Sequence, residues 1–227
     1  MKRILITVFL PFTAFIMNHA ENIDHHTGTH LGPAFLEKLT SPSPWLKSRE
    51  EVLELLPKGV ICAEIGVGDG DFSHSIKAIS KPAKVYLIDC WEQQDRSAYP
   101  DDFNIATDLQ IKRYESVKKM FANDANVEVL RMYSKDAVAL FPDEHFDWVY
   151  IDSNHTYEAV KEDLEMWLPK VKNGGYICGH DYILPREVYG LPFGVVPAVN
   201  EFIKKHSFEL VYLTTEKFAT YVIRVKK

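Results

Sequence analysis

The 227-residue chain has few cysteines, no internal repeats and no concentration of positive charge. Its three cysteines, Cys62, Cys90 and Cys178, lack metal-finger spacing, and two of them fall in apolar strand-like runs, which favours buried free thiols. The formal net charge is −6 and no run is rich in Lys and Arg, so electrostatically driven binding to nucleic acid is disfavoured. These absences argue against a zinc finger, a disulfide framework and a nucleic-acid-binding domain.

The N-terminus also lacks an apolar segment long enough to cross a membrane. As a helix, residues 4–17 would span about 21 Å, less than the roughly 30 Å hydrocarbon core, so no transmembrane anchor is favoured. The basic start, the short apolar stretch and the small residue Ala20 are typical of a secretory signal peptide. We expect residues 1–20 to be such a signal and the protein to be exported. A buried N-terminal helix, or an overextended start codon on a cytoplasmic protein, would explain the same residues.

Downstream of the signal, the pattern predicts an extension with one helix over 21–56 and a single domain over 57–227. In that domain apolar strand-like runs alternate with helical patterns. The expected strands are 60–66, 83–90, 127–130, 146–152 and 176–181, and the expected helices are 45–56, 71–79, 105–121, 136–140, 160–171 and 195–203. The segments 208–213 and 218–225 are typical of a closing hairpin. This order predicts an α/β, Rossmann-like, doubly wound and mostly parallel seven-stranded sheet with an antiparallel hairpin.

Glycines and carboxylates gather where the predicted strands end. Glycines 66, 68 and 70 follow the first strand, Asp89 ends the second, Asp152 ends the fourth and Asp181 ends the fifth. In parallel sheets, ligands bind beyond the carboxyl ends of the strands. The sequence therefore predicts one shared ligand site at this edge of the sheet.

The first of these segments, AEIGVGDGDFS (63–73), contains Glu64, Gly66, Gly68 and Gly70. Glycines at a strand-to-helix turn allow a tight bend and close approach of a ligand to backbone N–H groups. A dinucleotide-binding fingerprint needs a third glycine where Asp71 stands, which weakens an NAD or FAD interpretation. An acidic residue before G-x-G-x-G instead resembles class I S-adenosylmethionine (SAM)-dependent methyltransferases.

That resemblance implies SAM as cofactor and assigns it a set of contacts. The implied cofactor-binding residues are Glu64, Gly66, Gly68, Gly70, Asp89, Ser134 and Asp136. Asp89 would accept the protons of the ribose hydroxyls, and the segment that begins at Ser134 would hold the adenine. Two structural alternatives stay open: Asp89 as a helix cap, and Glu64 as a buried partner of a backbone amide.

The stretch DWVYIDSNHTYEAVKEDLEMWLPKVKNGGYICGHDY (147–182) more narrowly resembles macrolide-sugar O-methyltransferases and cephalosporin hydroxylase-like proteins. That resemblance implies that Asp152, Asp181 and the residue at position 180 bind magnesium, and that His155 is the general base. This chain has His180 where an acidic residue is expected, and imidazole matches magnesium less well than a carboxylate does. The expected ligands are therefore Asp152, Asp181 and His180, around Mg²⁺ or another divalent cation.

Together these residues predict an enzyme that methylates a hydroxyl group of a small molecule or sugar, with catalytic roles for His155 and Asp152. A cation would lower the pKa of the acceptor hydroxyl, and His155 would take its proton. One alternative keeps the fold without the metal, and another is a non-catalytic SAM-binding domain. Two aromatic-rich loops, 91–103 and 182–193, are expected to shape the acceptor site. The sequence indicates neither the acceptor nor the oligomeric state.

Overall fold

The computed structural model describes residues 45–183 and 193–227. The signal peptide predicted over 1–20, the polar extension as far as residue 44 and most of the loop 182–193 lie outside the described residues, so the expectations for them stay predictions. The domain boundary predicted at residue 57 stays a prediction too. No helix in the described part of the chain combines the length and the apolar character that a bilayer span requires.

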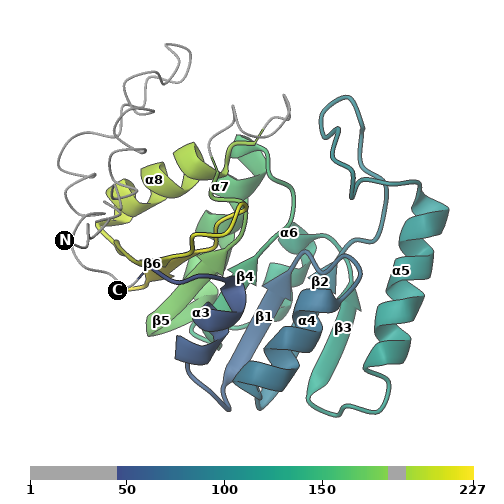
Figure 1. Cartoon of the computed structure of the whole chain (residues 1–227), viewed down its shortest axis with the longest axis horizontal. Helices are drawn as coiled ribbons and strands as arrows, with labels where there is room; N and C mark the ends of the chain where they lie inside the picture. The colour runs from purple at the N-terminus through teal and green to yellow at the C-terminus, as the bar shows by residue number, and fades with distance from the viewer. Residues whose placement is uncertain (1–44, 184–192) are drawn as a thin grey trace, which may run out of the picture. The chain divides into compact units, whose positions relative to one another are not determined.

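Seven strands form one sheet in the order β3-β2-β1-β4-β5-β7-β6 (Figure 1). The strands are β1 (Ile61–Ile65), β2 (Lys84–Asp89), β3 (Val127–Arg131), β4 (Phe146–Ile151), β5 (Val171–Gly179), β6 (Glu209–Leu213) and β7 (Tyr221–Arg224). The first five pair in parallel, β7 is antiparallel to β5, and β6 is antiparallel to β7. The predicted Rossmann-like fold with a closing hairpin is confirmed.

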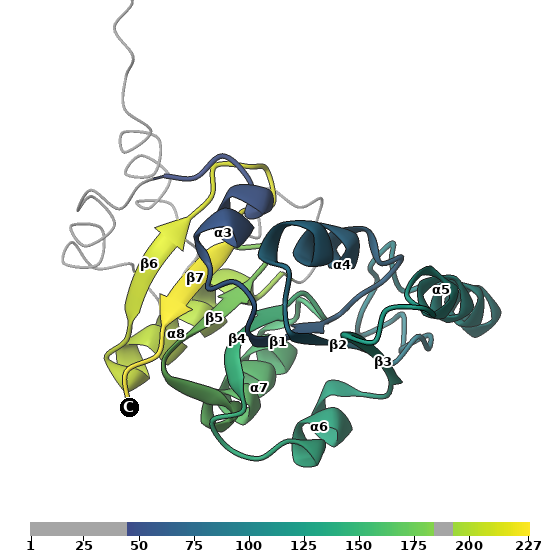
Figure 2. The ribbon, with the colours of Figure 1, turned by 90° about the horizontal axis from the view of Figure 1, so that it is seen from below.

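Helices cover both faces of this sheet, as a parallel sheet requires. The three helices α3 (Arg49–Leu55), α4 (Asp71–Ser75) and α5 (Thr107–Met120) lie on one face (Figure 2). The other face carries α6 (Ser134–Ala137), α7 (Tyr157–Trp167) and α8 (Val195–His206). Short helical turns, η1 (Ile76–Ser80), η2 (Val138–Leu140) and η3 (Leu168–Lys170), extend α4, α6 and α7.

Each face has its own hydrophobic core because successive strand residues point to opposite sides. In β4, Trp148 belongs to the core under α3, α4 and α5, whereas Val149 belongs to the core under α7 and α8. Both residues are fully buried. Cys62 and Cys178 are buried free thiols, as predicted, and both pack in the same core as Trp148. Because helices cover both faces of the sheet, the open sites for ligands are at the ends of the strands.

The largest differences between predicted and observed starts occur at two elements. Helix α3 starts at Arg49 rather than Trp45, because the backbone of Leu46 bonds beside β6: its N–H donates to Leu213 O at 3.3 Å. Leu46 O in turn accepts from the N–H of Thr215 at 2.8 Å. Strand β5 starts at residue 171 rather than 176, and its pairing with β4 carries an irregularity. The N-terminal helix is thus tied to the sheet through the segment that follows β6.

Candidate functional site

The glycine turn after β1 is fixed by backbone contacts with both neighbouring strands. Gly66 has φ +90°, and its N–H donates to Ile88 O of β2 at 2.8 Å. A Cβ atom on Gly66 would lie 1.9 Å from the carbonyl oxygen of Asp152, at the end of β4. Gly68 and Gly70 also have positive φ, +57° and +85°, which favours glycine. The turn is therefore shaped by the requirement that three strand ends meet closely.

Asp89, at the end of β2, holds this turn through its carboxylate. Its Oδ2 accepts the N–H groups of Val67 at 2.9 Å and Gly68 at 3.0 Å, and its Oδ1 accepts the N–H of Trp91 at 2.7 Å. The buried Trp91 ring donates from Nε1 to Gly68 O at 2.9 Å. Asp89 therefore holds the glycine turn rather than capping a helix, and its carboxylate retains one of about four acceptor positions.

Glu64 lies one residue before the end of β1 and is almost completely buried, with 1% of its surface exposed. One of its oxygens accepts a hydrogen bond from the hydroxyl of Ser73, in α4. Burial raises the pKa of Glu64 to about 8, although the bond from Ser73 opposes that shift. Glu64 is therefore a neutral acid near pH 7, placed behind the glycine turn.

Ser134 and Asp136 follow β3 but differ in environment. Asp136 is exposed, whereas the Ser134 hydroxyl donates to the carboxylate of Asp163 in α7 and accepts from Trp167 Nε1 at 2.8 Å. The other oxygen of Asp163 accepts from the Ser153 hydroxyl at 2.6 Å. Asp163, which is 5% exposed, therefore connects the turn after β3 to the turn after β4. Sequence reasoning missed this bridge, because nothing in the helical pattern of 160–171 distinguishes Asp163 from a surface carboxylate.

A charged cluster forms where β4 and β5 end, and it contains all the residues predicted for metal binding and catalysis. Asp152, His155 and Asp181 each offer a ligand atom within 4.8 Å of the others. His155 Nε2 lies 2.9 Å from Asp181 Oδ2 and 3.6 Å from Asp152 Oδ1. His180 Nδ1 lies 3.3 Å from Asp181 Oδ2 and 3.8 Å from Asp152 Oδ1. The structure thus brings all four predicted residues together, with His155 rather than His180 closing the tightest group.

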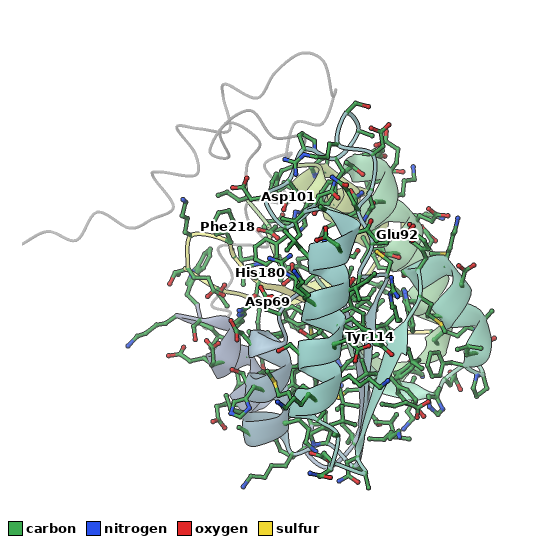
Figure 3. The ribbon with its side chains drawn as sticks, turned by 90° about the vertical axis from the view of Figure 1, so that its right-hand side faces the viewer. Asp69, Glu92, Asp101, Tyr114, His180 and Phe218 are labelled. Carbon is green, nitrogen blue, oxygen red and sulfur yellow. The ribbon has the colours of Figure 1, made fainter. Side chains whose placement is uncertain are left out.

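The loop between β2 and α5 adds residues that the sequence did not single out. This loop projects beyond the edge of the sheet where the parallel strands end (Figure 1). Its Asp101 lies 3.6 Å from His155 Nδ1, and its Tyr99 hydroxyl lies 3.4 Å from the same nitrogen. Asp101 and His180 lie at the same end of the domain, whereas Tyr114 lies lower on α5 (Figure 3). The loop was expected to shape the acceptor site, but no spacing rule connects Asp101 to a histidine 54 residues later.

Carboxylates on three sides govern the protonation of His155. Burial by itself would lower its pKa, but the attraction of the Asp101, Asp152 and Asp181 carboxylates outweighs burial and raises the pKa well above its usual value. The pKa of Asp181 shifts the other way: burial would raise it, and hydrogen bonds from His155 and His180 hold it well below its usual range. In the protein alone, the three carboxylates therefore favour the protonated form of His155.

The donor set also fits a divalent cation. Two carboxylates, Asp152 and Asp181, converge with an imidazole nitrogen, and unpaired carboxylates this close would repel one another. Magnesium requires oxygen ligands and retains waters, so two carboxylates satisfy its protein ligation, and a histidine ligand shifts the preference toward manganese or iron. Asp152 and Asp181 would hold such an ion, with a histidine beside them.

Comparisons with known proteins agree with this architecture. The profile of the family described as "Methyltransferase domain" matches residues 63–182, more than half of the chain. The uncharacterized protein R132 of Acanthamoeba polyphaga mimivirus is 32% identical over 90 residues, which cover 37% of this chain but only 38% of the viral protein.

Solved structures resemble the chain in fold. A putative methyltransferase from Streptococcus mutans in complex with SAH superposes with a TM-score of 0.53 at 13% identity, over 78% of this chain and 94% of that one. An O-methyltransferase family protein from Burkholderia thailandensis gives 0.55 at 10% identity, over 79% and 55% of the two chains. Aeropyrum pernix fibrillarin with bound SAM gives 0.52 at 12% identity, over 77% and 73%. At these identities the likeness shows the fold alone.

Proposed function

The chain belongs to the family of methyltransferase domains, and from this premise we propose that it transfers the methyl group of SAM to a hydroxyl group of a small molecule or sugar, with a divalent cation. Within the family we place it beside the macrolide-sugar O-methyltransferases and cephalosporin hydroxylase-like proteins. The observation that carries the proposal is the cluster of Asp152, His155 and Asp181, which lies directly beside the glycine turn. Cofactor and acceptor sites would then adjoin, as a direct transfer requires.

The cofactor would lie over the ends of β1 and β2. The residues that would hold it are Glu64, Gly66, Gly68, Gly70, Asp89, Ser134 and Asp136. SAM supplies a methyl group activated by its sulfonium. The free acceptor position of the Asp89 carboxylate can take a ribose hydroxyl while its other bonds keep the turn in shape. Cofactor binding would therefore use an arrangement already formed in the protein.

The acceptor would lie over the ends of β4 and β5. Alignment of a hydroxyl with the methyl carbon can contribute about 7–11 kcal/mol where geometry is good. His155 would accept the hydroxyl proton, and Asp101 and Tyr99 would orient its ring from the Nδ1 side. A cation held by Asp152 and Asp181 would lower the pKa of that hydroxyl, and by neutralising the two carboxylates it would favour the neutral, proton-accepting form of His155.

A metal-independent transferase of the same fold is the second candidate. It is favoured by one contact, the 2.9 Å ion pair between His155 and Asp181, because this pair balances the carboxylate without a metal. The two carboxylates would then contact the substrate only. A non-catalytic SAM-binding domain is a further alternative, which methyl transfer to any acceptor would exclude.

The decisive experiment measures methyl transfer from labelled SAM to a panel of hydroxylated acceptors, with magnesium or manganese and with excess chelator. We expect chelator to abolish transfer. Asp181→Ala should lower metal-stimulated transfer at least about 100-fold, while the affinity for S-adenosylhomocysteine (SAH), the demethylated product of SAM, changes less than about threefold. Asp143→Ala is the matched control, because Asp143 is an exposed carboxylate whose partner, Lys170, lies outside the site. Full activity in chelator would favour the metal-independent candidate. Binding of SAM without transfer to any acceptor would favour the non-catalytic one.

A further inference from the structure

Arg49, the first residue of α3, places a half-buried guanidinium at the edge of this site. Its Cζ lies 4.3 Å from the centre of the Phe72 ring, and its Nη1 lies 3.7 Å from Asp152 Oδ2. The Nε atom lies 3.8 Å from Glu50, and 27% of the side chain is exposed. Both separations exceed hydrogen-bonding distance, and within residues 45–183 and 193–227 no hydrogen bond from this guanidinium is found. A group with five donors thus lies beside the site, and none of these donors is hydrogen-bonded to another described residue.

The neighbours of Arg49 define its position relative to the glycine turn. Phe72 is the second residue of α4, directly after the turn, and its ring packs at 4.4 Å against Tyr150 of β4. Asp152 follows β4, and its carbonyl touches Gly66. The guanidinium therefore lies where the start of α4, the glycine turn and the end of β4 meet.

The helix does not need this side chain to stay in place. Val52, Leu53 and Leu56 are buried under α3, with exposed fractions of 0%, 0% and 3%. The backbone of Leu46 is bonded on both sides, to Leu213 and Thr215. Since these contacts fix the helix, the placement of Arg49 beside the site calls for a different explanation.

We propose that Arg49 binds the α-carboxylate of the methionyl part of SAM, an inference that rests on the proposed function. With the ribose at Asp89 after β2 and the methyl group directed at the cluster after β4, the sulfur lies over β1. The amino-acid branch then leaves the sulfur beside the glycine turn, which α4 and Arg49 flank. A planar guanidinium binds a carboxylate through two parallel hydrogen bonds, which the present ion-pair partners do not provide.

The test compares two ligands that differ by the amino-acid part. SAH carries the carboxylate, whereas 5′-methylthioadenosine carries the same adenosine and sulfur without it. Calorimetry on the full chain should show that Arg49→Leu weakens SAH binding by about 10- to 100-fold, while its affinity for methylthioadenosine stays within about twofold of the wild-type value. The SAH affinity of Arg49→Lys should lie between those of the wild type and Arg49→Leu, because an ammonium keeps the positive charge but cannot form two parallel hydrogen bonds to a carboxylate. Lys47→Leu is the matched control, since it removes an exposed positive charge two residues away.

Each outcome bears on the proposal. Thermal unfolding establishes first that the Arg49→Leu variant is folded, with a stability close to that of the wild type. Unchanged SAH affinity in the folded variant would overturn the inference, and so would an equal loss for both ligands, because neither outcome depends on the carboxylate. Failure of the wild type to bind SAH would instead overturn the proposed function, and the methylthioadenosine measurement would reveal any remaining adenosine site.

Discussion

The two halves of the site are built by different means. On the cofactor side, at the ends of β1 and β2, the turn is set by glycine φ angles and by backbone N–H groups bonded to Asp89. On the acceptor side, at the ends of β4 and β5, ionisable side chains from separate segments converge on His155. Backbone conformation and strand pairing set the first half, whereas side chains from strand ends and loops assemble the second. Changes on the cofactor side should therefore act on folding and binding, and changes on the acceptor side on rate.

The largest effect is expected at Gly66, where the two halves touch. Gly66→Ala should lower the free energy of unfolding by at least about 4 kcal/mol, because the new Cβ would lie 1.9 Å from the carbonyl oxygen of Asp152. Gly174→Ala is the control: Gly174 also has positive φ, but a Cβ there meets nothing within 4 Å, so only about 1–2 kcal/mol of backbone strain is expected. Urea denaturation measures both. Equal losses would show that strain alone, not contact between the halves, requires glycine at 66.

The next prediction distinguishes the two halves of the site by comparing an effect on the rate with an effect on cofactor affinity. His155→Ala should lower kcat by about 10²- to 10⁴-fold, because loss of a base is felt in the transition state, while SAH affinity stays within about twofold. His206→Ala is the control, since His206 also pairs with a carboxylate, Glu165 at 3.1 Å, but lies at the end of α8. Single-turnover rates and calorimetry give the two readouts. A parallel fall in rate and affinity would contradict the division of the site.

A third effect concerns the pH dependence of stability on the cofactor side. The pKa of Glu64 rises from 4.5 to about 8 on folding, so the folded state holds a proton that the unfolded state releases. The protonated Glu64 contributes at most about 5 kcal/mol to the free energy of unfolding. This contribution is fully present below pH 4.5 and is lost as the pH rises through about 8. Glu64→Gln, which stays neutral, should not lose this contribution.

The measurement is urea denaturation of both proteins at about pH 5 and about pH 9, because groups other than Glu64 titrate alike in the two and cancel. A difference between wild type and Glu64→Gln that stays constant with pH would show that Glu64 is ionised in the folded protein. The cofactor side would then resemble the acceptor side in carrying a buried charge.

The sequence predicts the cofactor side more fully than the acceptor side. Gly66, Gly68 and Asp89 follow their strands directly, so strand order alone brings them to one edge. Asp152 and Asp181 were predicted in the same way, because β4 and β5 are neighbours, whereas the role of His155 was implied by the family resemblance. Asp101 could not be predicted, since its approach to His155 depends on the path of a loop with no periodic pattern.

Helix α3 was predicted, but the approach of Arg49 to Asp152 was not. That contact depends on how the helix packs over α4, and propensity and periodicity carry no information about such packing.

The Ser134–Asp163–Ser153 bridge has a consequence for engineering chimeras. One buried carboxylate on α7 receives a hydroxyl from the turn after β3 and another from the turn after β4. A graft that replaces only the acceptor-side turn with that of a relative must preserve a donor opposite Asp163, or it leaves a buried carboxylate short of a partner. The loop between β2 and α5 makes no hydrogen bond to Asp163 in the described structure, so new acceptor specificities can be grafted there if Tyr99 and Asp101 are kept beside His155, while the segment 134–163 is inherited as a unit.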